Sequence, residues 1–325
     1  MNYSSILLNN AARIPIIGFR TSTIEDPIQL KLAMEAALKS GCRHFDTNNL
    51  NKNERIVGKV IERWISRGLL KREELFITAT LPMAGVHPER VEIFMDKSLK
   101  NLGLDYVDLY LIQFPVTVKY NEIIDLPVNE MGEIQTETTD LIEVWQKMED
   151  MSDYSRARAI GVSNFNKDQI LRILEKARIK PAVLQIEIHP YFQNQHLVDF
   201  CGQKGITVVA YSPFGSPRTN PFNKEEGSLK NKTFNVLEDK TVISISEKHS
   251  KTPAQIVSRF LVHMGVAIIW KSSNTSRISE NMDIFNYSLD KSDIIKLKNL
   301  DKGDNARTNS MALKGLLEHP EYPFK

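Results

Sequence analysis

The sequence predicts an α/β protein folded as a (β/α)8, or TIM, barrel. Short apolar segments alternate with segments of helical periodicity along most of the 325 residues, an order typical of parallel βαβ units. No G-x-G-x-x-G follows the first apolar strand segment, so the dinucleotide fingerprint of a doubly wound sheet, the main alternative, is missing. Because such barrels often run to about 250 residues or more, we expect one domain over residues 1–325.

A β-hairpin is expected ahead of the barrel. Two apolar runs, Leu7-Leu8 and Ile14–Ile17, flank a turn that contains Asn9-Asn10. Asn tolerates the positive φ that tight turns need, which favours a hairpin here.

Strands of the barrel are expected in seven apolar segments, and an eighth is expected near Phe285–Ser288. The closing Pro115 after the third segment indicates a buried strand that ends in a loop at Gln113. The seven segments are Cys42–Thr47, Leu75–Leu81, Val107–Phe114, Ala159–Ser163, Val183–His189, Thr207–Tyr211 and Val266–Lys271.

Helices are expected between these strands, where apolar residues recur every three or four positions. In residues 27–40, for example, Leu30, Met34 and Leu38 fall on one helical face. Pro88 stands near an expected helix start, where a missing N–H is tolerated. The expected helices are Pro27–Ser40, Glu54–Arg67, Pro88–Asn101, Thr139–Met151, Lys167–Ala177, Gln195–Lys204, Thr252–His263 and Ser276–Phe285.

Two connections are longer than usual for a compact domain. They are Val116–Thr138 and Ser216–Leu237, and an irregular tail begins at about Asp301. Loops that follow the strands of a parallel barrel lie at its carboxyl-terminal face, where barrel proteins hold their ligands. We therefore expect the long loops to border a binding site.

The composition excludes several classes of protein. Hydrophobic residues make up 42% of the chain and charged residues 25%, as in ordinary soluble domains. The 42 Lys and Arg nearly balance the 40 Asp and Glu, for a net charge of +2, which does not support binding to nucleic acid or to a membrane surface. The sequence also predicts no metal site.

The two cysteines, Cys42 and Cys201, are too few for a disulfide framework and are expected to be reduced, buried thiols. The amino terminus has no basic region followed by an apolar stretch, and no segment reaches 18 uninterrupted apolar residues. We therefore expect a cytoplasmic protein without a membrane span.

Seven short motifs follow one another along the chain. They are Gly41-x-Arg43-His44-Phe45-Asp46, Asn53-Glu54 with Val57-Gly58, Leu99-x-x-Leu102 through Tyr110, Ile160-Gly161-Val162-Ser163-Asn164-Phe165, Gln185–Tyr191, Ala210-Tyr211-Ser212-Pro213 and Arg277-Ile278-x-Glu280-Asn281. Together, in this order and spacing, they resemble the motifs of the aldo-keto reductases, and the resemblance extends from the first hairpin to Pro323-Phe324. The resemblance implies the fold of that family, its NADPH or NADP cofactor and a monomer.

The resemblance implies a catalytic set of Asp, Tyr, Lys and His, in which three of the four positions are replaced here. In the family a Tyr hydroxyl donates the proton, a Lys ammonium lowers its pKa, the Asp holds the Lys, and the His helps to bind the developing oxyanion. Matched by local motif, these positions are Asp46, Asn51, Thr80 and Gln113.

The replacements predict weak or absent carbonyl reduction. Asn51 cannot release a proton near neutral pH, although the Gln113 amide can still donate a hydrogen bond. Thr80 carries no charge, so we expect Asp46 to lack a partner and the pocket to lack its only cation. Lys52, beside Asn51, is an alternative acid, but a solvated surface Lys is the favoured interpretation.

The cofactor positions, in contrast, are retained. The resemblance places the nicotinamide carboxamide at Ser163, Asn164 and Gln185, and stacks the ring on Tyr211. It implies phosphate contacts in residues 212–216 and 271–277, where Lys and Arg charges stand at a helix start. The full set is Thr21, Ser163, Asn164, Gln185, Tyr211, Ser212, Phe214, Ser216, Lys271, Ser272, Asn274, Arg277, Glu280 and Asn281.

Three hypotheses follow for the function. The first is an NADP(H)-binding homologue, or pseudoenzyme, with little or no turnover. The second is an active NADPH-dependent aldehyde or ketone reductase whose acid catalysis is rewired through Asp46 or a water molecule. The third is a binding protein for a small ligand without turnover. In each case the expected partner is a small carbonyl compound or a related molecule.

Overall fold

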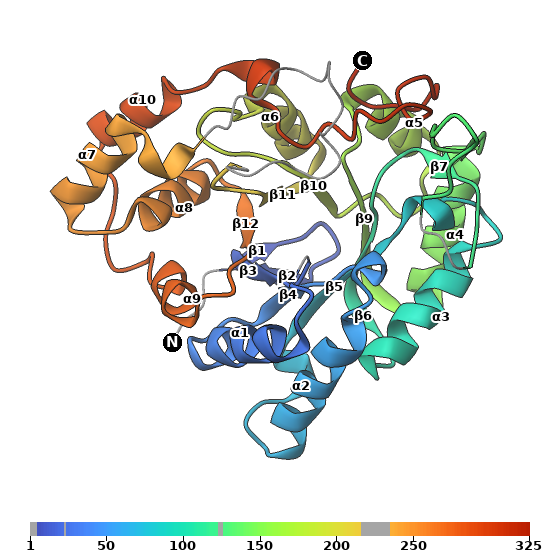
Figure 1. Cartoon of the computed structure of the whole chain (residues 1–325), viewed down its shortest axis with the longest axis horizontal. Helices are drawn as coiled ribbons and strands as arrows, with labels where there is room; N and C mark the ends of the chain where they lie inside the picture. Colours follow the sequence, from blue (N-terminus) through green and yellow to red (C-terminus); the bar gives the residue numbers. More distant parts are fainter. Residues whose placement is uncertain (1–4, 23, 123–125, 216–234) are drawn as a thin grey trace.

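The computed structural model describes residues 5–22, 24–122, 126–215 and 235–325. Within these residues eight parallel strands close into a barrel in the order β10-β11-β12-β3-β4-β5-β6-β9, and helices surround it (Figure 1). The predicted (β/α)8 barrel is therefore confirmed. The barrel strands are β3 (Ile17–Arg20), β4 (His44–Asp46), β5 (Phe76–Leu81), β6 (Val107–Ile112), β9 (Ala157–Ser163), β10 (Val183–Glu187), β11 (Thr207–Tyr211) and β12 (Ala267–Trp270).

The helices cover the outside of the barrel through their apolar faces. All eight expected helices are present with small changes in their bounds, and α7 and α10 are additional. The helices are α1 (Pro27–Lys39), α2 (Glu54–Ser66), α3 (Val91–Leu102), α4 (Leu141–Asp153), α5 (Lys167–Lys176), α6 (Gln195–Lys204), α7 (Lys240–His249), α8 (Pro253–His263), α9 (Thr275–Met282) and α10 (Lys291–Lys298).

One helix start was predicted three residues too early. The expected helix at Pro88 begins instead at Val91, as α3. The preceding residues form a turn, in which the Arg90 backbone N–H donates to the His87 carbonyl at 2.9 Å. Pro88 therefore lies in this turn and not in the first turn of the helix.

The expected hairpin is confirmed and lies at the amino-terminal end of the barrel. Strands β1 (Ser5–Leu7) and β2 (Arg13–Pro15) pair in antiparallel register. Between them, the Asn9 amide donates to the Pro181 carbonyl at 2.9 Å and the Asn10 amide donates to the Arg158 carbonyl at 2.7 Å. The hairpin is thus fastened to the start of β9 and to the segment that leads into β10.

The expected eighth strand near Phe285–Ser288 is wrong. The barrel closes instead through β3, which pairs with β12 at Ile17 and with β4 at Phe19. Phe285 is 43% exposed, whereas Phe19 is fully buried in the core. The four residues of β3 follow the hairpin so closely that their apolar pattern merges with it, which explains the error.

The long loop over residues 116–138 has structure of its own. Its ends form a two-stranded sheet, with β7 (Thr117–Val118) paired to β8 (Thr136–Glu137). Arg90 holds this sheet through two hydrogen bonds to the Glu137 carboxylate, at 2.9 and 3.0 Å. Most of the second long loop, residues 216–234, lies outside the described residues.

The carboxyl-terminal tail packs against the barrel (Figure 1). The backbone N–H of Asn309 donates to the Glu187 carboxylate at 2.8 Å, and the Asn166 amide donates to the Pro323 carbonyl at 3.2 Å. The tail is therefore anchored to β10 and to the loop that follows β9.

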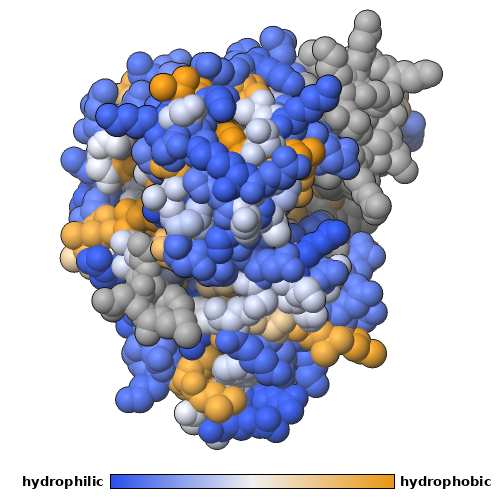
Figure 2. All heavy atoms as spheres, turned by 90° about the vertical axis from the view of Figure 1, so that its left-hand side faces the viewer, coloured by the Kyte–Doolittle hydropathy of each residue, from blue (hydrophilic) through white to orange (hydrophobic). Residues whose placement is uncertain are grey.

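Both cysteines are free and buried, and burial raises the pKa of each thiol to about 12. Within the described parts of the chain, no helix combines the length and the apolar character that crossing a membrane requires. Figure 2 shows the face that carries α7 and α10 as mainly hydrophilic, with separate hydrophobic spots.

Candidate functional site

Polar residues gather where the barrel strands end. Arg20 ends β3, Asp46 ends β4, Ser163 ends β9 and Tyr211 ends β11, while Gln185 lies near the end of β10. Because all strands of the barrel are parallel, their carboxyl ends form one rim. The sequence-predicted residues Asp46, Ser163, Gln185 and Tyr211 are therefore brought to the same face of the barrel.

The carboxylate of Asp46 is buried at this rim, with 2% of the residue's surface exposed. The Gln185 amide donates to Asp46 Oδ2 at 2.9 Å, and Arg20 Nε lies 3.5 Å from Asp46 Oδ1. Burial raises the pKa of Asp46, while the charge of Arg20 and the hydrogen bond from Gln185 act in the opposite direction. The expectation that Asp46 lacks a partner is wrong.

Arg20 is the site residue that sequence reasoning missed. Its guanidinium carbon lies 5.3 Å from the centre of the Tyr211 ring, and its side chain is 25% exposed. The expectation that this site has no cation is therefore also wrong. The available signal was a charged residue three positions after the apolar run Ile14–Ile17, which was assigned to the hairpin and not to a barrel strand.

Thr80 lies in β5, and Gln113 directly follows β6, the neighbouring strand. Thr80 is 4% exposed, and its hydroxyl has no hydrogen-bond partner among the described residues. The Gln113 backbone accepts a hydrogen bond from the Asn164 amide at 2.9 Å, while its side-chain oxygen is buried without a partner in the described chain. Both positions thus place neutral polar atoms at the rim.

Asn51, which the motif comparison predicts to stand at the position of the family's Tyr, lies in the short 3-10 helix η1 (Asn49–Asn51). The structure does not describe the side chain of Asn51. Lys52, the alternative acid, ends η1 with a left-handed φ of 52° and is exposed. Its exposure favours the interpretation as a surface Lys.

The residues predicted to hold nicotinamide form a connected network. The Tyr211 hydroxyl donates to Asn164 Oδ1 at 2.6 Å, and the Asn164 amide lies 3.2 Å from Ser163 Oγ. Burial raises the pKa of Tyr211, so this phenol is not an acid near neutral pH. The structure therefore brings Ser163, Asn164 and Tyr211 together as expected, but with their polar atoms already bonded to protein.

Thr21 joins the first two strands of the rim. Its hydroxyl and its backbone N–H donate to the Asp46 carbonyl at 3.1 and 3.0 Å, and its own carbonyl accepts from the Asn53 amide at 2.9 Å. Thr21 is fully buried. Its position next to Asp46 therefore reflects a structural role as well as the expected cofactor contact.

The loop after β11 contributes the next predicted residues. Ser212 has a positive φ of 49°, and its carbonyl accepts from the Gly215 N–H at 2.9 Å. Phe214 is half-buried against the core. Ser216, the last predicted residue of this loop, lies outside the described residues.

The segment after β12 contains the residues that were predicted to contact the 2′-phosphate. Asn274 caps α9 by accepting from the Arg277 N–H at 3.1 Å, and Ser272 Oγ accepts from the Asn274 N–H at 3.1 Å. Lys271 and Arg277 lie at the surface beside this helix start. The pKa of Lys271 is lowered by the loss of solvent around its ammonium group and by the charge of Arg20. The residues fit a phosphate, because charged donors and a helix amino terminus converge.

The last two predicted cofactor residues lie further along α9. Asn281 is 4% exposed, whereas the Glu280 side chain is exposed at the surface. One turn of helix separates them from Arg277, so all three can face one bound nucleotide.

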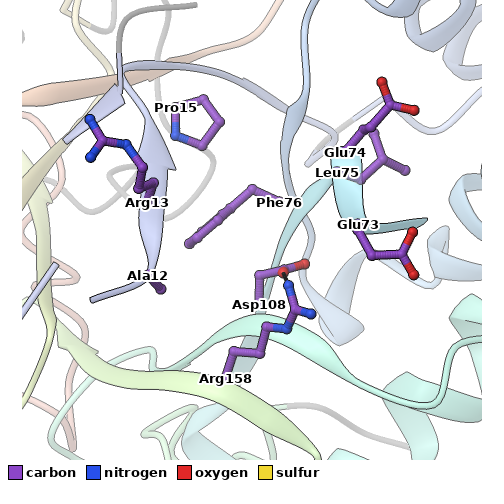
Figure 3. A pocket seen from close by; sticks show the side chains of 9 residues that line it. All are labelled: Ala12, Arg13, Pro15, Glu73, Glu74, Leu75, Phe76, Asp108 and Arg158. Carbon is purple, nitrogen blue, oxygen red and sulfur yellow. Dashed lines mark hydrogen bonds and ion pairs between the residues drawn. The ribbon is translucent and has the colours of Figure 1, made fainter. Parts of the chain in front are cut away.

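A separate cavity of about 250 Å³ opens at the opposite end of the barrel, between the hairpin and the starts of β5, β6 and β9 (Figure 3). Asp108 at its wall is already paired, at 2.8 Å with Arg72 and at 3.4 Å with Arg158. Elsewhere, the described residues contain no group of three His, Cys, Asp or Glu that could hold a metal ion. The rim is therefore the candidate site. The cavity is lined by Ala12, Arg13, Pro15, Glu73, Glu74, Leu75, Phe76, Asp108 and Arg158.

A closed parallel barrel with its polar groups at the carboxyl ends is the arrangement of barrel enzymes. The sequence model described as "Aldo/keto reductase family" matches residues 18–302 of the chain. The chain therefore belongs to the aldo-keto reductase family, whose members are oxidoreductases that use NAD(P)H and bind small carbonyl substrates.

Individual relatives match over nearly the full length. "Aldo-keto reductase family 1 member C1" of Homo sapiens is 39% identical over 326 residues, which cover 99% of this chain and 98% of that protein. "Dihydrodiol dehydrogenase 3" of Bos taurus is 38% identical over 324 residues, 98% of this chain and 97% of that protein. The solved aldose reductase of Schistosoma japonicum aligns with a TM-score of 0.89 and 35% identity over 99% of each chain.

The raised pKa of Asp46 predicts a pH-dependent contribution to stability. A carboxyl group whose folded pKa lies above its ordinary value of 3.8 destabilises the fold increasingly as the pH rises from that value through the folded pKa. As the pH rises from acidic to neutral, the free energy of unfolding of Asp46→Asn should therefore fall less than that of the wild type. Urea unfolding across this range, with the exposed Asp168→Asn as control, measures the difference. Identical pH profiles for Asp46→Asn and the wild type would contradict the prediction.

Proposed function

We propose that this chain binds NADP(H) at the barrel rim and reduces carbonyl compounds weakly or not at all. One observation carries the proposal: the carboxylate of Asp46 forms an ion pair with Arg20 and accepts a hydrogen bond from Gln185, and the neighbouring positions of the proposed catalytic set are Thr80 and Gln113. Hydride delivery to a carbonyl needs a proton for the oxygen, and neither of these neutral side chains releases one near neutral pH.

The alternative is a reductase in which Asp46 itself donates the proton. Its raised pKa favours this role, because a protonated carboxyl group can act as an acid. Arg20 and Gln185 argue against it, since both stabilise the charged carboxylate. Oxidation of NADPH with a panel of aldehydes and ketones separates the two candidates. Steady turnover that Asp46→Ala abolishes would favour the alternative.

Selectivity for NADPH over NADH is supported by the segment after β12. The 2′-phosphate distinguishes the two nucleotides, and Lys271, Arg277 and the helix start at Asn274 together suit a dianion. We further propose that the protein is a cytoplasmic monomer, which suits the mainly hydrophilic face in Figure 2. Its remaining ligand would be a small carbonyl compound or a related molecule.

NADPH should quench the intrinsic fluorescence of the protein, because Trp270 directly precedes Lys271. Arg277→Gln should weaken NADPH binding by about tenfold or more, since it removes one charge-assisted hydrogen bond to the 2′-phosphate. NADH lacks this phosphate, so its weaker binding should change little. Arg13→Gln, at the opposite end of the barrel, is the control. The absence of quenching at millimolar NADPH would contradict the proposed function.

A further inference from the structure

Arg20 lies beside the Tyr211 ring, on which the proposed function would stack the nicotinamide ring. Its guanidinium carbon lies 5.3 Å from the centre of the Tyr211 ring, the ring on which nicotinamide is proposed to stack. We propose that Arg20 is a specificity-determining residue that selects against the cationic ring of NADP⁺, in favour of NADPH and of 2′-phosphorylated nucleotides without nicotinamide. This inference rests on the proposed NADP(H) function.

The position of the Arg20 charge is held from two sides. Its Nε lies 3.5 Å from the Asp46 carboxylate, and its guanidinium is within cation–π distance of Tyr211. The side chain is 25% exposed, so the charge is only partly screened by solvent. The oxidised nicotinamide ring also carries a positive charge, and two cations beside the same aromatic ring repel each other. The reduced ring is neutral and avoids this repulsion.

The groups proposed to hold the carboxamide are also engaged. The Gln185 amide donates to Asp46 at 2.9 Å. The Asn164 amide donates to the Gln113 carbonyl at 2.9 Å, and its oxygen accepts from the Tyr211 hydroxyl. A nicotinamide seated here must displace these bonds. The ring should therefore add little affinity, and a nucleotide that ends at the ribose should bind about as well as NADPH.

The positive charge of Arg20 should also favour binding of the nucleotide's phosphate groups. The positive charge of Arg20 reaches Lys271 and contributes to the lowered pKa of that ammonium group. Arg20 and Lys271 thus create a common positive field between the rim and the start of α9. A field of this sign attracts the pyrophosphate and the 2′-phosphate and repels the oxidised ring, so one residue acts on the two ends of the nucleotide in opposite directions.

The test compares three nucleotides on the full-length protein by calorimetry: NADPH, NADP⁺ and 2′-phosphoadenosine diphosphate ribose. The wild type should bind NADP⁺ about tenfold more weakly than NADPH, a ratio equivalent to about 1.4 kcal/mol. Arg20→Gln should bring this ratio towards one, and Arg20→Lys, which keeps the charge, should largely preserve it. Arg13→Gln is the control for a lost surface charge. Added salt should reduce the ratio in the wild type, a measurement that needs no variant.

The outcomes separate this inference from the proposed function. If none of the three nucleotides binds, the proposed function fails. If all bind but the wild type does not discriminate, or if Arg20→Gln discriminates as strongly as the wild type, the role of Arg20 is overturned while nucleotide binding stands. Arg20→Met provides a second neutral variant in case Arg20→Gln does not fold, and circular dichroism checks both.

Discussion

Rebuilding the family's catalytic set should raise NADPH-dependent carbonyl reduction by about 10²–10⁴-fold, the usual contribution of a positioned acid. The variant combines Asn51→Tyr, Thr80→Lys and Gln113→His with Arg20→Gly. The first two changes restore a proton donor and the cation that lowers its pKa, and the third restores the imidazole at the oxyanion. The measurement is the initial rate of NADPH oxidation with a panel of aldehydes and ketones.

The change at Arg20 is essential to this design. In the family's set the Asp holds the Lys, whereas here Asp46 lies 3.5 Å from Arg20. The triple variant that retains Arg20 should therefore gain much less activity than the quadruple variant, because Arg20 competes with the new Lys for the carboxylate of Asp46. The prediction fails if the quadruple variant binds NADPH but oxidises it no faster than the wild type.

Replacing Glu187 with Ala should lower the free energy of unfolding by about 3–5 kcal/mol. Glu187 is 2% exposed and accepts from the backbone N–H groups of Thr308 and Asn309, at 3.0 and 2.8 Å. It also accepts from the Thr308 hydroxyl, and His189 Nε2 lies 3.2 Å away. Alanine would leave these groups without an acceptor, so the tail should detach from β10 more readily.

This stability should depend on pH in a defined direction. Burial alone would raise the pKa of Glu187, but the hydrogen bond and charge of His189 and the bonds from Thr308 bring it below the ordinary value of 4.5. The stabilisation is therefore present above pH 4.5 and lost as the pH falls through the lower folded value. The free energies of unfolding of the wild type and of Glu187→Ala should thus become more similar at acidic pH.

Urea unfolding at several pH values measures both effects, and limited proteolysis reports on the tail. The exposed Glu175→Ala is a suitable control and should change stability by less than about 0.5 kcal/mol. If Glu187→Ala lowers the free energy of unfolding no more than this control does, the anchoring role of Glu187 is ruled out.

Local patterns predicted the regular elements well where apolar periodicity was long or sharply bounded. The strand Thr207–Tyr211 and the helix Gln195–Lys204 have the bounds that the sequence predicted. The strand Ile17–Arg20 was missed because four residues beside a hairpin do not carry a period of their own. Only closure of the barrel, through pairing with β4 and β12, assigns them to a strand.

The retained motifs likewise predicted which residues gather at the rim. Asp46, Gln185 and Tyr211 end up near one another because parallel strands bring their carboxyl ends together. The motifs did not predict their bonding partners. The bond from Gln185 to Asp46 joins residues 139 positions apart, a separation at which local sequence patterns carry no information.

The proposed loss of the family's proton donor and Lys rests on residue types alone, since Asn51, Thr80 and Gln113 have the same functional groups in any conformation. The charge of the site, in contrast, does not follow from residue types alone. Whether Asp46 is paired depends on which side chain from another strand lies beside it. Electrostatic interaction falls off with distance and depends on burial. The pairing of Asp46 is therefore determined only by the folded barrel, which brings Arg20 to Asp46 and Tyr211.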